Sequence, residues 1–228
     1  MTDAALDSVH LDRPARAWAN PSWLLRSLLL ALVALGLGYW LAGRQTPGPA
    51  SAEVGFARDM SEHHMQAVQL AKLLYDRSQD EGLRLLAYDI MLSQQGQIGM
   101  MGGWLDAWGY PRTQLGPKME WMGMSVSGRM PGLASPEEIE RLAAAQGVEA
   151  EVLFMQLMIP HHHAGAHMAE AAAERASLDY VRNLARHMAE SQTAEIAYLQ
   201  ELLQDRGQPP VDVEAGLAEP HPAEHAAP

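Results

Sequence analysis

Apolar side chains recur every three to four positions along most of the chain, and this pattern predicts a protein built from helices. The period runs through residues 53–78, about 79–108, 148–176 and 178–206, with a shorter helix expected from Pro136 to Gln146. No segment shows the period of two that is typical of a half-buried strand. The pattern therefore predicts an all-α domain.

Two of these helices start at sequences typical of a capping box. Ser78 with Glu81 is expected to cap one helix, and Ser135 with Glu138 to cap the short one. Pro136 then stands at the first helical position, where proline is favoured.

A separate apolar run, residues 23–43, precedes the helical domain. It is uncharged from Ser27 to Gly43, which is close to the minimum for crossing a bilayer, and Trp23 and Trp40 lie at its two ends. Arginines precede the run, which favours a cytoplasmic N-terminus. We expect a single-pass membrane anchor with the remaining chain extracytoplasmic, in the periplasm or at the cell surface. A signal peptide cleaved near Ala50-Ser51-Ala52 and a buried core helix are the alternatives.

The composition then divides the chain into segments. Residues 1–22 form a short cytoplasmic segment, and the proline-containing linker 44–52 is an extended tether. The helical domain spans 53–206, with a Gly-, Pro- and Met-rich crossover at 109–134. The acidic, proline-rich tail 207–228 is predicted to be disordered.

The domain contains an internal duplication. When the chain is shifted against itself by 98 positions, thirteen of the fifty positions from Phe56 to Leu105 are identical: Phe56/Phe154, Met60/Met158, His63/His161, His64/His162, Ala71/Ala169, Arg77/Arg175, Arg84/Arg182, Leu86/Leu184, Ala87/Ala185, Ser93/Ser191, Gln94/Gln192, Ile98/Ile196 and Leu105/Leu203. Two matching helical hairpins joined by one long crossover describe a ferritin-like four-helix bundle.

The repeated motif carries the candidate chemistry. At about 100° per residue, each methionine and its histidine pair lie on the apolar stripe of their helix. A pseudo-two-fold axis between the hairpins would bring the two motifs face to face in the interior. The candidate metal ligands are Met60, His63, His64, Met158, His161 and His162.

Imidazole and thioether are the ligands that suit copper here. Imidazole is the commonest protein metal ligand, and thioether favours Cu(I), while so many imidazoles also accommodate Cu(II). One buried histidine is more often an ordinary core residue than a ligand. Four of them, each needing its own buried partner, favour a metal site.

Further polar groups lie around this motif. Gln94 and Gln192 fall on the apolar stripes and could orient the histidine rings, or could instead reach solvent. His163 and His167 face away from the core, four residues apart, as a second candidate metal pair whose alternative is a solvated pair.

Composition excludes several function classes. A formal net charge of −12 disfavours a nucleic-acid partner. The absence of cysteine excludes disulfides and thiolate sites. Fourteen methionines fit plastic core packing as well as metal binding.

The doubled Met-x-x-His-His motif resembles the bacterial domain of unknown function family 305. The Gln-x-x-[Gln/Glu]-Ile pieces at Gln94 and Gln192 and the Met-Pro-Gly-Leu-Ala-Ser stretch from Met130 carry the same resemblance, which covers about residues 54–205. It implies a ferritin-like bundle, exported or membrane-anchored. Some relatives bind copper through histidine and methionine and are tied to copper tolerance. The second copy's His163 and His167 are Met65 and Gln69 in the first, so an outer site is not expected to be doubled.

Three functions compete. The first is a membrane-anchored protein that binds or buffers copper in copper homeostasis, with a copper-handling protein as a candidate partner. The second is a ferritin-like di-metal oxidase, but no histidine has a glutamate three positions before it, as that chemistry normally requires. The third is a structural or sensory bundle whose histidines titrate. We favour the non-enzymatic copper protein.

Overall fold

The computed structural model describes residues 21–43 and 46–213 and divides into two compact units. Residues 1–20, most of the predicted cytoplasmic segment, lie outside the described residues, as do 214–228 of the predicted tail. Within the described part the chain is all-helical, with one isolated bridge between Lys118 and Val126.

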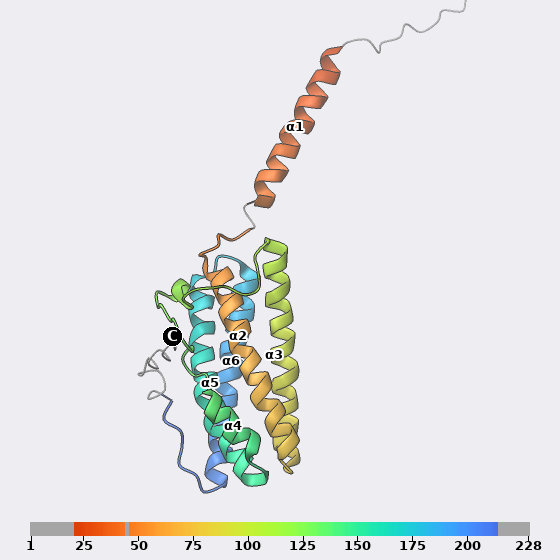
Figure 1. Cartoon of the computed structure of the whole chain (residues 1–228). Coiled ribbons are helices and arrows are strands. Elements are labelled where there is room, and N and C mark those ends of the chain that lie inside the picture. Colours follow the sequence, from red (N-terminus) through yellow and green to blue (C-terminus); the bar gives the residue numbers. More distant parts are fainter. Residues whose placement is uncertain (1–20, 44–45, 214–228) are drawn as a thin grey trace, which may run out of the picture. The chain divides into compact units, whose positions relative to one another are not determined.

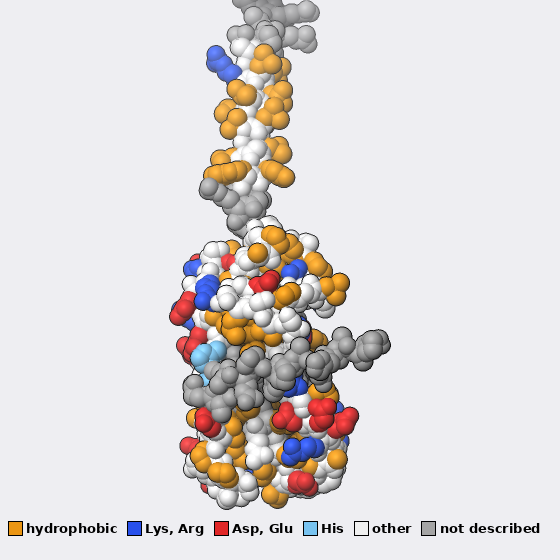
Figure 2. Space-filling view, turned by 60° about the vertical axis from the view of Figure 1, so that its left-hand side comes forward, with side chains coloured by type: hydrophobic (Ala, Val, Ile, Leu, Met, Phe, Trp, Pro, Cys, Tyr) orange, Lys and Arg blue, Asp and Glu red, His pale blue; other side chains and the backbone are white. Residues whose placement is uncertain are grey.

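The first unit contains α1, Pro21–Gly43. Its window Ser22–Trp40 has a mean hydropathy of 1.6, and none of it is buried. On the face seen in Figure 2, hydrophobic side chains occur along the described length of this helix. By length and composition α1 could cross a membrane, and it fits either a signal peptide or a single-pass anchor.

The second unit is a four-helix bundle made of two hairpins. Its long helices are α2 (Ala52–Arg77), α3 (Glu81–Trp108), α5 (Gly147–Arg175) and α6 (Asp179–Asp205). The α2/α3 hairpin and the α5/α6 hairpin meet along α2 and α5 (Figure 1). The crossover carries the short 3₁₀ helix η1 (Glu120–Met122) and α4 (Pro136–Ala144). The predicted fold class is confirmed.

Pseudo-two-fold symmetry is visible in the contacts between the hairpins. Glu53, at the start of α2, accepts hydrogen bonds from Ser177 in the loop between α5 and α6. Its duplicate, Glu151 of α5, accepts a hydrogen bond from Ser78 in the loop between α2 and α3. Burial alone would raise the pKa of Glu53, but the Ser177 hydroxyl and neighbouring amides outweigh it and hold that pKa below its usual range.

The helix starts differ from one sequence expectation. The capping box of Ser135 and Glu138 is present at α4. The box expected at Ser78 does not form, because Asp80 caps α3 by accepting from the Leu83 amide. Ser78 instead ends α2 and donates its hydroxyl to Glu151.

The bundle core consists of two hydrophobic clusters. One contains Phe56 and Met60 of α2 with Met168 of α5, and the other contains Leu70 of α2 with Phe154 of α5. Because α2 and α5 run antiparallel, the clusters occupy opposite halves of the bundle, and the histidine pairs lie between them in both helices. The chain also continues past α6 against the bundle, where Gln200 pairs through its amide with the backbone of Val211. The tail was expected to be disordered from residue 207, so this part differs from the expectation.

Candidate functional site

The four histidines of the duplicated motif form a polar layer in the middle of the bundle. His63 and His64 of α2 and His161 and His162 of α5 each expose 1% of their surface or less. The rings of His63 and His161 are in contact, with centroids 3.8 Å apart. His161 and His162 have centroids 6.0 Å apart. The convergence of the two histidine pairs in the interior, expected from the sequence pattern, is therefore present.

Hydrogen bonds fix the same ring nitrogen in three of the four histidines. His64 donates from Nε2 to Gln97 Oε1 at 2.6 Å, and His162 Nε2 lies 2.6 Å from a carboxylate oxygen of Glu195. His161 donates from Nε2 to the backbone carbonyl of His63 at 3.1 Å. In a neutral ring, a proton on Nε2 leaves the lone pair of Nδ1 free.

These Nδ1 atoms are buried without a hydrogen-bond partner. Within the described part of the chain, none is provided for Nδ1 of His64, His161 or His162. Neither ring nitrogen of His63 makes a hydrogen bond of normal geometry, although the Pro131 carbonyl approaches the ring. Buried polar atoms are normally paired, so several unpaired ones in a single layer require an explanation.

Burial keeps three of these imidazoles, those of His63, His64 and His161, neutral. It lowers the pKa of His64 to about 4 and moves the pKa values of His63 and His161 well below their ordinary value, with the neighbouring histidines adding to the effect. Burial opposes ionisation of Glu195, but the hydrogen bond to His162 outweighs it and lowers the pKa of that carboxyl. Neutral imidazoles are the form that binds metal ions.

The two motif methionines lie on opposite sides of the histidine layer. Both are fully buried, but Met60 belongs to the cluster with Phe56 and Met158 to the one with Phe154. The sequence expectation placed them face to face with the opposite motif. Antiparallel packing of α2 and α5 instead places each methionine one helical turn from its own histidines, towards a different half of the bundle.

The positions of the side chains in the histidine layer limit how many of them can bind one metal ion. No three His, Asp or Glu side chains in residues 21–43 and 46–213 form a group placed to bind one metal ion. Two contacting imidazoles with bare nitrogens, and thioethers in the adjacent core layers, supply the donor chemistry of a soft-metal site. Small ring rotations would be needed to direct more than two nitrogens at one ion.

The crossover covers the histidine layer. Gln66 of α2 holds Ala134 through two hydrogen bonds, one from its amide to the carbonyl and one from the Ala134 amide to Oε1. Gly132 lies directly on α5, because a Cβ there would come within 2.6 Å of the Pro160 carbonyl. Its φ of 76° also favours glycine. Met130 is fully buried beneath this segment.

The outer histidine pair is separate from this layer. His163 and His167 rings meet edge to face, with centroids 4.7 Å apart, and His167 is exposed. The structure therefore places them together on the outer face of α5, as the spacing predicted. The described residues show no group of three metal-binding side chains there.

Sequence reasoning missed the partners of the histidines. Gln94 and Gln192 are buried, but their side-chain oxygens bond to no described group. The Gln192 amide occupies the space above Gly165, where a Cβ would lie 2.2 Å from Oε1. The partners are Gln97 and Glu195, which occupy equivalent positions 33 residues after their histidines. A polar residue kept at the same position of both repeats was the available signal.

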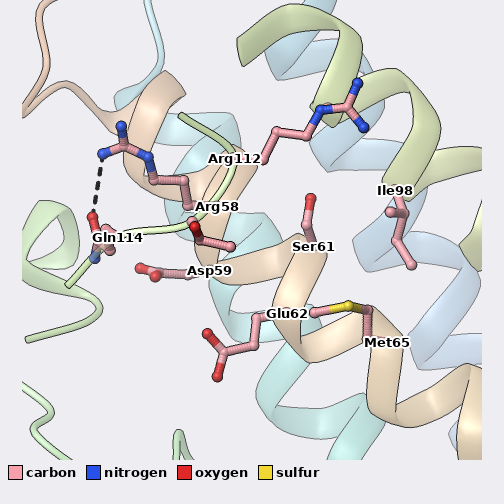
Figure 3. Close-up of a pocket in the computed structure, with 10 residues that line it drawn as sticks. Arg58, Asp59, Ser61, Glu62, Met65, Ile98, Arg112 and Gln114 are labelled. Atoms are coloured by element: carbon pink, nitrogen blue, oxygen red, sulfur yellow. Dashed lines mark hydrogen bonds between the residues drawn. The ribbon is translucent and has the colours of Figure 1, made fainter. Parts of the chain in front are cut away.

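The crossover also borders a surface pocket of about 560 Å³, distinct from the histidine layer. It lies between α2, α3 and the loop after α3, and Figure 3 shows Arg58 of α2 hydrogen-bonded to Gln114 of that loop. Two of the charged side chains that line it form ion pairs: Arg112 with Asp106, and Glu62 with Lys118. None of the described histidines lines this pocket.

Comparison with known proteins identifies the fold family. The family model described as domain of unknown function (DUF305) matches residues 53–203. No protein with a curated description matches the chain. A DUF305 protein of Streptomyces coelicolor, described as secreted, is 45% identical over 72% of this chain and 99% of its own, with a TM-score of 0.69. A DUF305 fragment from Deinococcus radiodurans is 34% identical over 68% of this chain and 96% of its own, with a TM-score of 0.58.

A third solved structure is CopM in its Cu(I)-bound form. It is 24% identical over 68% of this chain and 97% of its own, with a TM-score of 0.52, which shows a shared fold. The internal duplication, the four-helix bundle and these matches agree on one assignment. The chain is a member of the DUF305 family.

Proposed function

We propose that this protein is a membrane-anchored extracytoplasmic copper-binding protein that buffers Cu(I), and more weakly Cu(II), through its buried histidine layer. One observation carries the proposal. The histidine layer buries ring nitrogens that have lone pairs but no hydrogen-bond partner. A bound soft cation would satisfy them, and it would offset the free energy lost when they leave water.

His63, His64, His161 and His162 are the proposed imidazole ligands. Met60 and Met158 would supply thioethers from the core layer on either side, which favours Cu(I). His163 and His167 are proposed as a weaker outer pair. Gln97 and Glu195 would hold the rings of His64 and His162 with Nδ1 directed inward, as outer-shell partners of metal-binding histidines do.

Two further observations support this function. CopM, which has the same fold, is seen in Cu(I)-bound, Cu(II)-bound and silver-bound forms. The secreted Streptomyces relative and the apolar helix α1 agree with export, and we propose that α1 remains as the anchor. A copper-handling protein is the proposed partner.

The test is a Cu(I) titration of residues 47–228 against a competing chelator. These residues form a compact unit of their own, and the family match falls within them. We expect tight binding that is lost when His63 and His161 are both changed to Ala. The matched control changes His163 and His167 to Ala and should keep the tight site. Unaltered tight binding in the His63/His161 variant would contradict the proposal, and no binding by the parent protein would favour a histidine bundle that responds to pH.

A further inference from the structure

The outward face of α3 exposes a row of apolar side chains, of which Tyr88 lies against Tyr75 of α2. Leu85, Tyr88 and Leu92 expose 62%, 46% and 56% of their surfaces, and Met100 exposes 46%. At about 100° per residue, the first three lie with Gly96, Gly99 and Gly103 in an arc of about 80°. We call this set of seven residues the α3 stripe. α3 forms one edge of the bundle (Figure 1).

Comparison with α6, the helix that corresponds to α3 in the second repeat, shows that the fold does not require apolar residues on this face. The positions of α6 equivalent to the stripe are also exposed. They are Asn183, Arg186, Glu190, Ala194, Ala197, Tyr198 and Glu201. Leucines and glycines on α3 therefore replace charged residues and alanines that serve equally well on the outside of α6.

The glycines provide the second, independent observation. A Cβ added at Gly96, Gly99 or Gly103 would meet nothing within 4 Å, so no packing inside the described chain requires glycine there. Each glycine weakens a helix relative to alanine. Exposed glycines on one helix face allow another backbone to approach closely, as small residues do between packed helices.

We propose that the α3 stripe is the surface on which two copies of this protein associate. The stripe is self-complementary about Gly96, because Leu92 and Met100 lie four residues before and after it. In an antiparallel crossing of two α3 helices at Gly96, Leu92 of each copy would meet Met100 of the other. A two-fold contact requires this kind of symmetry.

Charge favours a second copy over other partners. No Asp, Glu, Lys or Arg occurs between Asp89 and Asp106, so two chains of net charge −12 can meet here without direct repulsion. The stripe carries no basic residue with which to hold an anionic membrane or a nucleic acid.

The size of the stripe predicts a weak dimer. From Leu85 to Gly103 it is about 27 Å long at 1.5 Å per residue, the length of a single helix contact. Such a contact buries less than the roughly 800 Å² per partner of a standard stable interface. We therefore expect association that depends on protein concentration.

The absence of cysteine makes a sharp test available. We would introduce Gly96→Cys in residues 47–228 and, as matched control, Ala194→Cys at the equivalent exposed position of α6. A disulfide requires Cα atoms within about 7 Å, so crosslinking reports close approach at the two-fold axis. Under mild oxidation Gly96→Cys should give a covalent dimer and Ala194→Cys should stay monomeric.

A second variant tests the apolar contact without cysteine. Leu92→Glu copies the residue at the equivalent position of α6, and it should raise the dimer dissociation constant in sedimentation equilibrium by about tenfold or more. Circular dichroism should show unchanged helix content, because Leu92 is exposed. Equal crosslinking of both cysteine variants, or a monomer at about 1 mM with no crosslink, would overturn the proposal. So would Leu92-dependent binding to neutral lipid vesicles without self-association.

Discussion

Replacing His63 with Leu tests whether the buried histidines destabilise the metal-free protein. His63 is fully buried, and its ring nitrogens make no hydrogen bond of normal geometry within the described chain. Each unpaired buried polar group costs about 1–3 kcal/mol. A leucine of similar volume removes that loss, and imperfect packing against His161 returns up to about 1.5 kcal/mol. We expect the metal-free variant to be more stable by about 1 kcal/mol.

The assay is urea and thermal unfolding of residues 47–228 in the presence of a metal chelator. A gain of about 1 kcal/mol corresponds to a rise in Tm of about 2–4 °C for a domain of this size. His162→Leu is the matched control, because it leaves the Glu195 carboxylate without its ring partner. The His162→Leu variant should have a lower free energy of unfolding than the His63→Leu variant.

Destabilisation of the metal-free bundle by more than about 1 kcal/mol in His63→Leu would refute this prediction. The His63 nitrogens would then make favourable interactions in the native protein, and the main support for a copper site would be lost. Copper added to the parent bundle should raise its Tm, and the same addition should have little effect on His63→Leu.

Three further predictions follow from the same geometry. In the unfolded chain His64 takes up a proton below about pH 6.5, whereas in the folded protein its pKa is about 4. Between these two pH values protonation favours the unfolded chain, so the stability of the metal-free protein should fall as the pH is lowered. Denaturation curves that coincide at pH 7 and pH 5 would contradict this. Gly132→Ala should cost about 1–3 kcal/mol in unfolding measurements through strain at positive φ and a clash with the Pro160 carbonyl, whereas Gly128→Ala, with open space around it, should be neutral. Glu195→Gln should leave stability nearly unchanged but weaken Cu(I) binding about 10–100-fold in chelator competition, and an unchanged affinity would contradict a role in orienting His162.

The sequence predicted what depends on helical phase and repetition. The register of the duplication placed His63 opposite His161, because two copies of one hairpin pack about a common axis. The helices were predicted from the spacing of apolar residues every three to four positions. The capping box at Ser135 was predicted from residues that hydrogen-bond locally. These features depend on neighbours three or four residues away or on the repeat itself.

The details that were not predicted depend on side-chain direction and on the sense of packing. Both Gln94 and Gln97 lie within one helical turn, and only the position of α3 on α2 decides which amide reaches His64. The antiparallel course of α2 and α5 separates Met60 from Met158, which phase on a single helix could not reveal. The choice of Asp80 over Ser78 as the cap of α3 depended on the long-range bond from Ser78 to Glu151.

The most direct test of the copper site is ¹⁵N NMR of the histidine side chains during titration of residues 47–228 with Cu(I). We predict that Nδ1 of His64, His161 and His162 changes chemical shift on binding, while their Nε2 atoms keep their protons. A titration that perturbs only His163 and His167, or that removes the proton from Nε2 of the buried rings, would contradict it.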